Sequence, residues 1–560
     1  MITQLFKKLF SSSKEKTSHP TSMNSVETNT MNKNQILYLG GTIITMDDMT
    51  PNAEAVVIEH DTILAVGSLS KLKAQFSDAR EYDLAGQTLM PSFIENHSHI
   101  LLCANMETMH DLSFFKYQEQ EEMMSAFQAM TPNKDGWLMG IGWDVKKQTI
   151  PCLSEIDNTH PDLPMFITMQ GHGGWLNTKA MEELGITKES EAPHNSEYVK
   201  DEHGELTGMI LGQAAVMQAY KGTFPTPEVA DVVSASHKYA EQGITVASDL
   251  MIMVPRTLHT VVEASKKDDF KVRIVGGIVN NYPDFAQVIS QKDEYRTDKF
   301  RIGFLKAFTD GSVQGGNAAT KLEYQNIEYK NLPRPIWGTQ DIFNQTASAA
   351  IQLGIDFVFH SNGEQALDAA LDAVEHARTT AEKNGQDVSN FMSLAHHLSL
   401  TEASQFERMK ELNTRPSFIM GHLYWTGGQI IHDYFKAEDL HHTFKVKTAI
   451  DNGLHPTLHN DAPVTPTAPW QSIQTAVTRK TFTGDVLNKD EAISIEQALK
   501  GYTIWAAEQF RLESTHGSLT AGKVADMIIV DQNPLAIEAD KLAQIKVIKT
   551  FLAGKETYSA

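Results

Sequence analysis

Eight short apolar runs, most of them separated by stretches with helical periodicity, constrain this sequence more than any other feature. The runs end near these residues: His99, Asp249, Val279, Phe308, His360, His397, Met420 and Asp461. Helices are predicted between them, for example over residues 363–383, 401–412 and 435–452. Alternating strand and helix signals are typical of a parallel α/β protein. Eight such units predict a TIM (β/α)₈ barrel, in which functional side chains gather at the carboxyl ends of the strands.

Both ends of the chain contain short runs rich in β-branched residues, with Gly, Asp and Asn at the turns between them. Neither end has enough strands to close a sheet pair alone. We therefore predict one small β-sandwich domain made from residues 34–88 and 512–560, with the barrel of residues 89–511 between them. The interval 103–240, between the first two barrel strands, is far longer than one helix needs and predicts an inserted subdomain.

Composition excludes several classes of protein. The chain has 560 residues, too many for one simple core, and its net charge of -22 argues against a nucleic-acid surface. The two cysteines, Cys103 and Cys152, provide no disulfide framework and favour a reducing, cytoplasmic location. No apolar run of 18 or more residues predicts a transmembrane segment. The chain is compatible with a homo-oligomer.

Residues 1–33 differ from the rest of the chain because Ser, Thr, Asn and Lys dominate them. This composition predicts a disordered leader. The alternative is weak contact of the first ten residues with a membrane surface, since apolar residues recur there at helical spacing beside two lysines.

The first apolar run ends in a His-x-His pair, His97 and His99. Alternate side chains of a strand share a face, so both imidazoles can bind one ion. Lys306 lies inside another apolar run, where an unpaired ammonium must find an anion, lose its proton or be modified. The alternative for Lys306 is an ordinary ion pair with Asp310.

Three further polar residues end apolar runs: His360, His397 and Asp461. His396 and His397 point to opposite faces of a strand, so only one of them is expected to face the barrel centre. Singly, each histidine is compatible with a core role and Asp461 with a turn cap. Together, polar groups at the ends of strands one, four, five, six and eight predict a centre for one or two divalent metal ions. A lysine carbamylated by CO₂ would bridge two ions and remove the buried charge.

The segments that carry these residues resemble the amidohydrolase superfamily, in the branch similar to N-substituted formamide deformylase. The ligand-bearing segments are Pro91–His99, Leu305–Ser312, His360–Glu364, His396–His397 and Asn460–Val464. The resemblance extends to segments without expected ligands, which include Gly142–Asp144, Gly171–Asn177, Gly208–Ile210 and Leu519–Asp526.

The resemblance implies a role for each candidate. His97, His99 and Asp461 would hold a first metal, with zinc as the expected ion, and His360 and His397 a second. A carbamate formed from CO₂ on Lys306 would join them. A hydroxide between the ions would attack the substrate, with Asp461 moving the proton.

One candidate lies outside the barrel strands. His172, in the inserted segment, matches a family position that meets substrate. The alternative is a loop histidine fixed by Trp175.

The sequence also departs from the family pattern. Ser92 and Glu95 replace the usual Gly and Asp before the first histidine, and Asn362 and Glu364 replace an apolar residue and Asp after His360. Before Asp461 stand His459 and Asn460, where Gly-Ser is commoner, which brings an extra imidazole toward the site. None of these changes removes an expected ligand.

We therefore predict a metal-dependent hydrolase that acts on a carbon–nitrogen bond other than a peptide bond, in an N-acyl or N-formyl amide of a small molecule. One alternative is the same site acting on an ester or lactone, because activated water attacks many electrophiles. The other is a metal- or ligand-binding regulatory protein with low activity.

Overall fold

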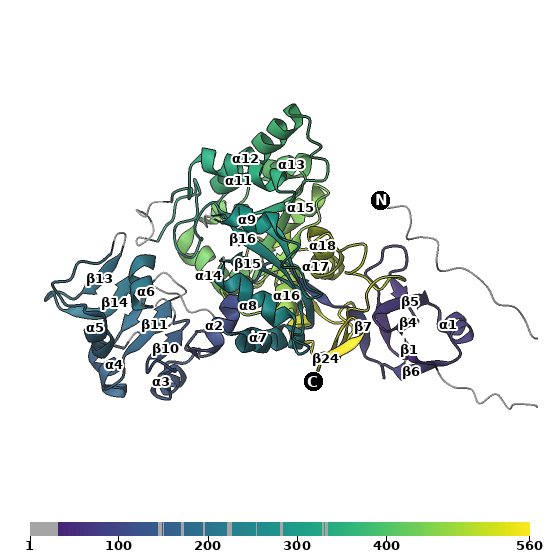
Figure 1. Ribbon diagram of the computed structural model, residues 1–560, viewed down its shortest axis with the longest axis horizontal. Helices are drawn as coiled ribbons and strands as arrows, with labels where there is room; N and C mark the ends of the chain where they lie inside the picture. Colours follow the sequence, from purple (N-terminus) through teal and green to yellow (C-terminus); the bar gives the residue numbers. More distant parts are fainter. Residues whose placement is uncertain are drawn as a thin grey trace, which may run out of the picture.

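The computed structural model describes residues 32–560 except 144–147, 149–150, 170–172, 194–195, 221–226, 254, 281–283, 327–329 and 331–333. The predictions for residues 1–31 and for His172 therefore lie outside the described residues. Figure 1 shows three regions side by side: a sheet of teal-blue strands, a central barrel, and a region in which a purple sheet lies beside a second sheet that joins the purple and yellow ends of the chain.

The centre of the molecule is the predicted barrel. Its eight parallel strands follow one another in chain order: β8 (Phe93–Glu95), β15 (Ile244–Ile252), β16 (Arg273–Val279), β17 (Phe300–Phe308), β18 (Asp356–Ser361), β19 (Ser393–His397), β20 (Thr414–Ile419) and β21 (Thr457–His459). Each coincides with one of the eight apolar runs, so the prediction of a TIM-like barrel is confirmed.

The segments that follow β21 and β8 form backbone hydrogen bonds with each other just beyond the ends of these two strands. The Asp461 amide donates to the His97 carbonyl at 3.1 Å, and the His99 amide donates to the Ala462 carbonyl at 2.8 Å. An isolated parallel bridge joins Ser98 to Ala462. The barrel therefore closes through the segments that carry the candidate metal ligands.

An apolar cluster fills the barrel interior. It includes one inward side chain from most strands, such as Ile94, Val246, Val275, Phe304, Val358 and Leu394. The helices surround the strands: α2 (Ile100–Glu107), α7 (Val229–Glu241), α8 (Arg256–Ser265), α9 (Phe285–Ser290), α11 (Gln340–Gln352), α12 (Glu364–Lys383), α13 (Ala403–Glu411), α14 (Met420–Gln429), α15 (Val446–Asp451), α16 (Pro469–Thr478), α17 (Ile495–Tyr502) and α18 (Ile504–Gln509).

The single helix predicted over residues 435–452 is wrong. The chain forms a π turn at Ile430–Tyr434, a 3₁₀ segment at Ala437–His442 and then α15. Between the last two, Phe444 takes a left-handed conformation with a φ of 44°. A continuous helix cannot pass through that conformation.

A second sheet occupies residues 110–211, between the first two barrel strands. Its six strands have the order β13-β14-β12-β11-β10-β9, with the bounds Glu197–Lys200, Leu206–Leu211, Gly173–Leu176, Met165–Met169, Leu138–Ile141 and His110–Asp111. Helices α3 (Gln120–Gln128), α4 (Leu153–Thr159), α5 (Thr178–Leu184) and α6 (Gln213–Ala219) accompany it. None of the helices in the described residues is both long and apolar enough to span a bilayer.

Two sheets lie at this end of the molecule, and the second of them pairs strands from both ends of the chain. One sheet has the order β5-β4-β1-β6 and the other β24-β23-β22-β7-β2-β3. The strands of the first are Thr62–Gly67, Ala55–Glu59, Asn32–Leu39 and Ala79–Asp83, and those of the second are Lys555–Ser559, Val547–Leu552, Met527–Val530, Thr88–Pro91, Thr42–Ile44 and Asn52–Ala53. A single apolar cluster contains Tyr38 and Val56 of the first sheet together with Leu89, Met527 and Phe551 of the second.

A buried histidine near these sheets makes stability depend on pH. Burial lowers the pKa of His516 from 6.5 to about 4. Between pH 6.5 and pH 4 this histidine binds a proton in the unfolded chain but not in the folded chain. Its contribution to the free energy of unfolding is therefore fully present above pH 6.5 and is lost as the pH falls towards 4. The difference between these two pKa values corresponds to a loss of about 3 kcal/mol.

We expect the His516→Asn variant to flatten this part of the profile. Urea unfolding of both proteins between pH 7 and pH 4 measures it, with the difference between them isolating His516 from other buried histidines. An identical pH slope in the two proteins would contradict the assignment.

Candidate metal centre

His97 and His99 lie in the short connection between β8 and α2, and both are buried. Ser98, between them, is fixed on β15 because its hydroxyl donates to the Ser248 carbonyl at 2.7 Å. His97 and His99 therefore project from a connection held on both sides, by β15 and by the segment after β21.

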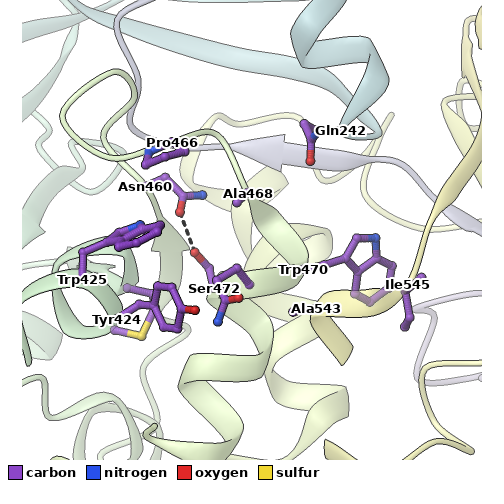
Figure 2. A pocket seen from close by; sticks show the side chains of 13 residues that line it. Gln242, Tyr424, Trp425, Asn460, Pro466, Ala468, Trp470, Ser472, Ala543 and Ile545 are labelled. Carbon is purple, nitrogen blue, oxygen red and sulfur yellow. Dashed lines mark hydrogen bonds between the residues drawn. The ribbon is translucent and has the colours of Figure 1, made fainter. Parts of the chain in front are cut away.

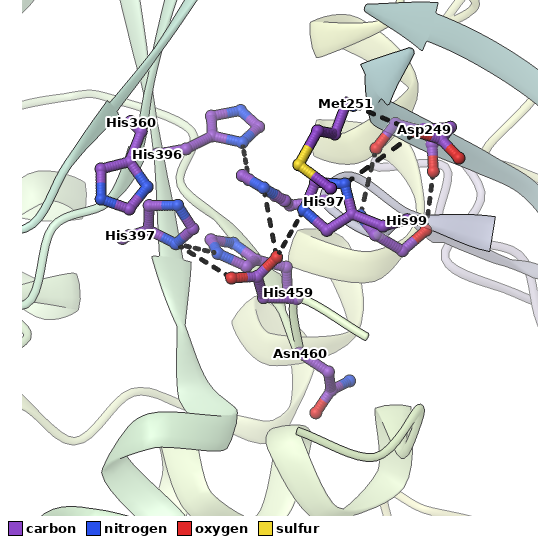
Figure 3. Close-up of polar contacts among 12 residues, drawn as sticks. His97, His99, Asp249, Met251, His360, His396, His397, His459 and Asn460 are labelled. Carbon is purple, nitrogen blue, oxygen red and sulfur yellow. Dashed lines mark hydrogen bonds and ion pairs between the residues drawn. The ribbon is translucent and has the colours of Figure 1, made fainter. Parts of the chain in front are cut away.

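Asp461 faces both of these imidazoles. Its Oδ1 lies 3.0 Å from His99 Nε2 and 3.3 Å from His97 Nε2, and its Oδ2 lies 3.9 Å from His397 Nδ1. Asp461 takes a left-handed φ of 61°, which turns its side chain away from the direction that β21 would give it. One carboxylate thus spans histidines of the first and sixth strands. Figure 3 shows these histidines, His97, His99 and His397, around one centre.

A second carboxylate, Asp249, lies behind His99. It lies within β15, with Oδ2 accepting from the Leu101 amide at 2.9 Å and Oδ1 3.9 Å from His99 Nδ1. Burial opposes the charge on His99, but Asp249 and Asp461 outweigh it and raise the pKa of His99 to about 9. Without a metal, His99 is therefore protonated, and its positive charge is stabilised by Asp249 and Asp461. A bound cation would interact favourably with the same two carboxylates.

His99 also affects Asp461. Burial by itself would raise the pKa of Asp461, but the hydrogen bond and the charge of His99 hold that pKa below its ordinary value. Asp461 is therefore ionised at neutral pH and available as a ligand or as a proton acceptor.

Both histidines at the end of β19 reach the centre, so the expectation that only one would do so is wrong. His396 has the same parity as the inward Leu394, and its Nδ1 lies 2.7 Å from His97 Nδ1. His397 has the opposite parity, but its φ of 80° ends the strand and redirects its side chain. Its Nδ1 lies 3.3 Å from His459 Nε2.

His459, the extra imidazole noted in the sequence, is fully buried at the end of β21. Its Nδ1 lies 2.7 Å from Ser417 Oγ on β20, which holds the ring with Nε2 directed at His397. Burial lowers the pKa of His459 to about 3, so the imidazole is neutral and retains a lone pair.

His360 stands slightly apart. Its Nε2 lies 3.0 Å from the Gly311 carbonyl and 3.1 Å from Asn362 Nδ2. Its ring centroid lies 4.3 Å from that of His397. Burial and the nearby Lys306 charge lower the pKa of His360 to about 3. His360 is thus a neutral imidazole beside His397.

Lys306 is fully buried, and its Nζ has no hydrogen-bond partner among the described residues. Burial lowers the pKa of Lys306 to about 7, although Asp461 opposes the shift. The alternative ion pair with Asp310 is not formed, because the Asp310 carboxylate accepts the amides of Asn362, Gly363 and Ala319. At neutral pH a substantial fraction of Lys306 is therefore the neutral amine, the form that reacts with CO₂.

Two sets of side chains place potential ligand atoms within 4.8 Å of one another: His97, His99 and Asp461, and His97, His397 and His459. All are buried, and His397 Nε2 and Lys306 Nζ have no hydrogen-bond partner in the described part of the chain. Neutral imidazoles and a carboxylate are the donors that zinc and similar cations take. The residues present therefore fit a divalent metal.

Asn460 links this centre to a neighbouring cavity of about 320 Å³. Figure 2 shows Asn460 at its wall with Trp425, Tyr424 and Trp470 around it. The Asn460 side chain accepts from Ser472 Oγ at 2.8 Å and donates to Glu95 Oε2 at 3.3 Å. These bonds fix the backbone of the segment that carries His459 and Asp461.

Comparisons with known proteins agree with this geometry. The family model described as "Amidohydrolase family" matches residues 80–558. The N-substituted formamide deformylase of Arthrobacter pascens is 25% identical over 93% of this chain and 98% of its own length. The putative amidohydrolase YtcJ of Bacillus subtilis is also 25% identical, over 93% of this chain and 99% of its own length.

Among solved structures, an uncharacterised metal-dependent hydrolase from Pyrococcus horikoshii superposes with a TM-score of 0.70. It is 23% identical and covers 90% of this chain and 99% of its own. The chain belongs to the amidohydrolase family. It is a hydrolase of the metal-dependent type, built on the barrel that this family shares.

His396 generates a specific prediction. If His97 uses Nε2 towards a metal, its Nδ1 donates to His396 Nδ1 and fixes the ring. We expect His396→Ala to lower zinc affinity about 10- to 100-fold, the usual effect of removing such a partner. His396→Asn, whose Oδ1 replaces the accepting nitrogen, should retain most of the affinity.

Competition with a chromophoric chelator measures both variants. Equal losses in the Ala and Asn variants would contradict the proposed hydrogen bond from His97.

Proposed function

We propose that this enzyme hydrolyses a carbon–nitrogen bond other than a peptide bond, in an N-formyl or N-acyl amide of a small molecule. The observation that carries the proposal is Asp461, whose two oxygens face His97 and His99 on one side and His397 on the other. Such a carboxylate can hold a metal and accept a proton from water beside it. The similarity to N-substituted formamide deformylase supports the choice of bond.

The site residues divide into ligands and a proton carrier. We assign His97, His99 and Asp461 to one metal position and His360 and His397 to a second, with zinc as the metal. The bound metal would lower the pKa of water and polarise the substrate carbonyl. Asp461 would take the proton of the attacking water and deliver it to the leaving nitrogen, which must be protonated to depart as an amine.

Lys306 is assigned as a carbamate formed with CO₂. Its amine is buried, its pKa is lowered to about 7, and its Nζ makes no hydrogen bond to the described residues. Addition of CO₂ to the amine forms an N–C bond and releases one proton, which leaves an anionic oxygen donor. Asp461 and the carbamate would then balance the charge of the metal.

The remaining assignments concern the whole chain. We propose that residues 34–88 and 512–560 form a β-sandwich, because their two sheets share one apolar cluster. Residues 89–511 would form the catalytic barrel with the subdomain 103–240 inserted.

Both cysteines are free thiols, which agrees with a cytoplasmic location. The role of His172 in substrate contact stays a sequence-based prediction.

A substrate panel tests the function. We expect the metal-loaded enzyme to hydrolyse N-formyl or N-acyl amines faster than matched esters and lactones. Loss of the proton carrier in Asp461→Asn should lower kcat by at least about 10³-fold. Asp439→Asn, at a partly exposed carboxylate of the 3₁₀ segment Ala437–His442, serves as the matched control and should retain full activity.

Two results would overturn the proposal. Turnover of esters or lactones with no amide hydrolysis would favour the alternative substrates. Absence of stoichiometric metal, together with no turnover of any substrate, would favour the regulatory alternative.

The carbamate has a test of its own. We expect Lys306→Ala to lose most of its bound metal and activity, because the anionic bridge is gone. A short carboxylic acid such as formate or acetate, small enough to enter the vacated space, should partly restore both. Metal analysis and kinetics with and without the acid measure the effect, and unchanged metal content in Lys306→Ala would contradict a carbamate ligand.

A further inference from the structure

Two imidazole nitrogens from different strands lie close together at the centre. His397 Nδ1, at the end of β19, is 3.3 Å from His459 Nε2, at the end of β21. Two nitrogens bound to one tetrahedral zinc at 2.0–2.1 Å lie about 3.3 Å apart. The two rings are tilted by 67° with their centroids 5.2 Å apart, so they are not stacked on each other. Their separation already suits a shared cation.

His459 is held as metal ligands usually are, through the nitrogen that points away from the site. Its Nδ1 lies 2.7 Å from Ser417 Oγ, and Thr457 Oγ1 donates to the same oxygen at 2.8 Å. All three residues are fully buried. This arrangement fixes the ring while Nε2 is directed towards His397, as in the supporting hydrogen bonds of known metal sites.

His97 supplies the third ring. Its centroid lies 4.9 Å from that of His459 with the planes inclined by 20°, and its Nδ1 is engaged by His396. The nitrogens of His97, His397 and His459 all lie within 4.8 Å of one another. Three buried imidazoles from the first, sixth and eighth strands therefore bring ring nitrogens close together, although the His97 and His459 rings are stacked.

We propose that His459 is a metal ligand, which joins His397 in the second metal position, next to His97 and beside Asp461. The inference rests on the proposed metal-dependent function but adds a ligand that the sequence-based assignment lacks. His97 offers one nitrogen to both ligand sets, so a cation held by His97 lies either nearer His99 or nearer His459. An additional imidazole favours zinc, copper or nickel over magnesium or manganese, which prefer oxygen donors.

The variant His459→Asn provides the test. The Asn side chain can still hydrogen bond to Ser417 but has no atom at the position of Nε2. We expect the variant to bind zinc at least about 100-fold more weakly in competition with a chromophoric chelator. The visible absorption of the cobalt(II)-loaded protein should also change, because one nitrogen donor is lost.

Two further variants separate ligation from packing. Ser417→Ala keeps the imidazole but removes its support, and we expect zinc affinity to fall about 10-fold. His516→Asn removes another buried histidine near the terminal sheets, and we expect the affinity and cobalt spectrum of the wild type.

The inference is overturned if folded His459→Asn keeps the zinc affinity and cobalt spectrum of the wild type. Retained metal-dependent amide hydrolysis with that result would leave the proposed function intact. If His459→Asn does not fold, X-ray absorption of the zinc-loaded wild type decides. Three or more imidazoles per zinc, with weakened binding in Ser417→Ala, support the inference, whereas fewer imidazoles or unchanged binding in Ser417→Ala overturn it.

Discussion

The structure depends on a few backbone hydrogen bonds that join the last barrel strand to the first. The Asp461 amide bonds to the His97 carbonyl, and the His99 amide to that of Ala462. Glu95 adds a side-chain connection to Asn460 across the same seam. Burial raises the pKa of Glu95 to about 8, so this carboxyl is largely protonated at neutral pH. The seam is thus held without placing a second buried charge beside Asp461.

Closing the barrel at the ligands has a chemical consequence. His97, His99 and Asp461 are positioned by the same bonds that complete the fold, so their geometry is set before any metal binds. Histidines from the fifth, sixth and eighth strands approach the same point, and burial keeps those imidazoles neutral. These neutral imidazoles, pre-organised beside the ionised Asp461, suit a divalent cation better than they suit the bare protein.

The sequence predicted the barrel because each strand is a continuous apolar run, the pattern of strands buried on both faces. It also identified the strand-end residues, which the structure gathers at one end of the barrel. The sequence did not reveal that both His396 and His397 reach the centre, because alternation holds only while the strand continues and His397 has a left-handed φ of 80°.

The sequence-based prediction did not include Asp249 or His459 among the residues of the metal centre. Asp249 ends a predicted strand segment, and its position there was an available signal. The role of His459 depends on Ser417, which lies 42 residues away in the chain and adjoins it only across neighbouring strands. Such a contact follows from strand register, which local patterns in the sequence do not specify.

The central claim is that a metal ion is held among these strand-end side chains. Anomalous diffraction from crystals of the protein, recorded on both sides of the zinc absorption edge, tests it most directly. The account predicts an edge-dependent peak within about 2.0–2.3 Å of a His97 nitrogen, with further ligands among the histidines and Asp461 of this centre. A well-ordered site with no anomalous peak in zinc-loaded crystals, or a peak only elsewhere on the protein, would contradict it.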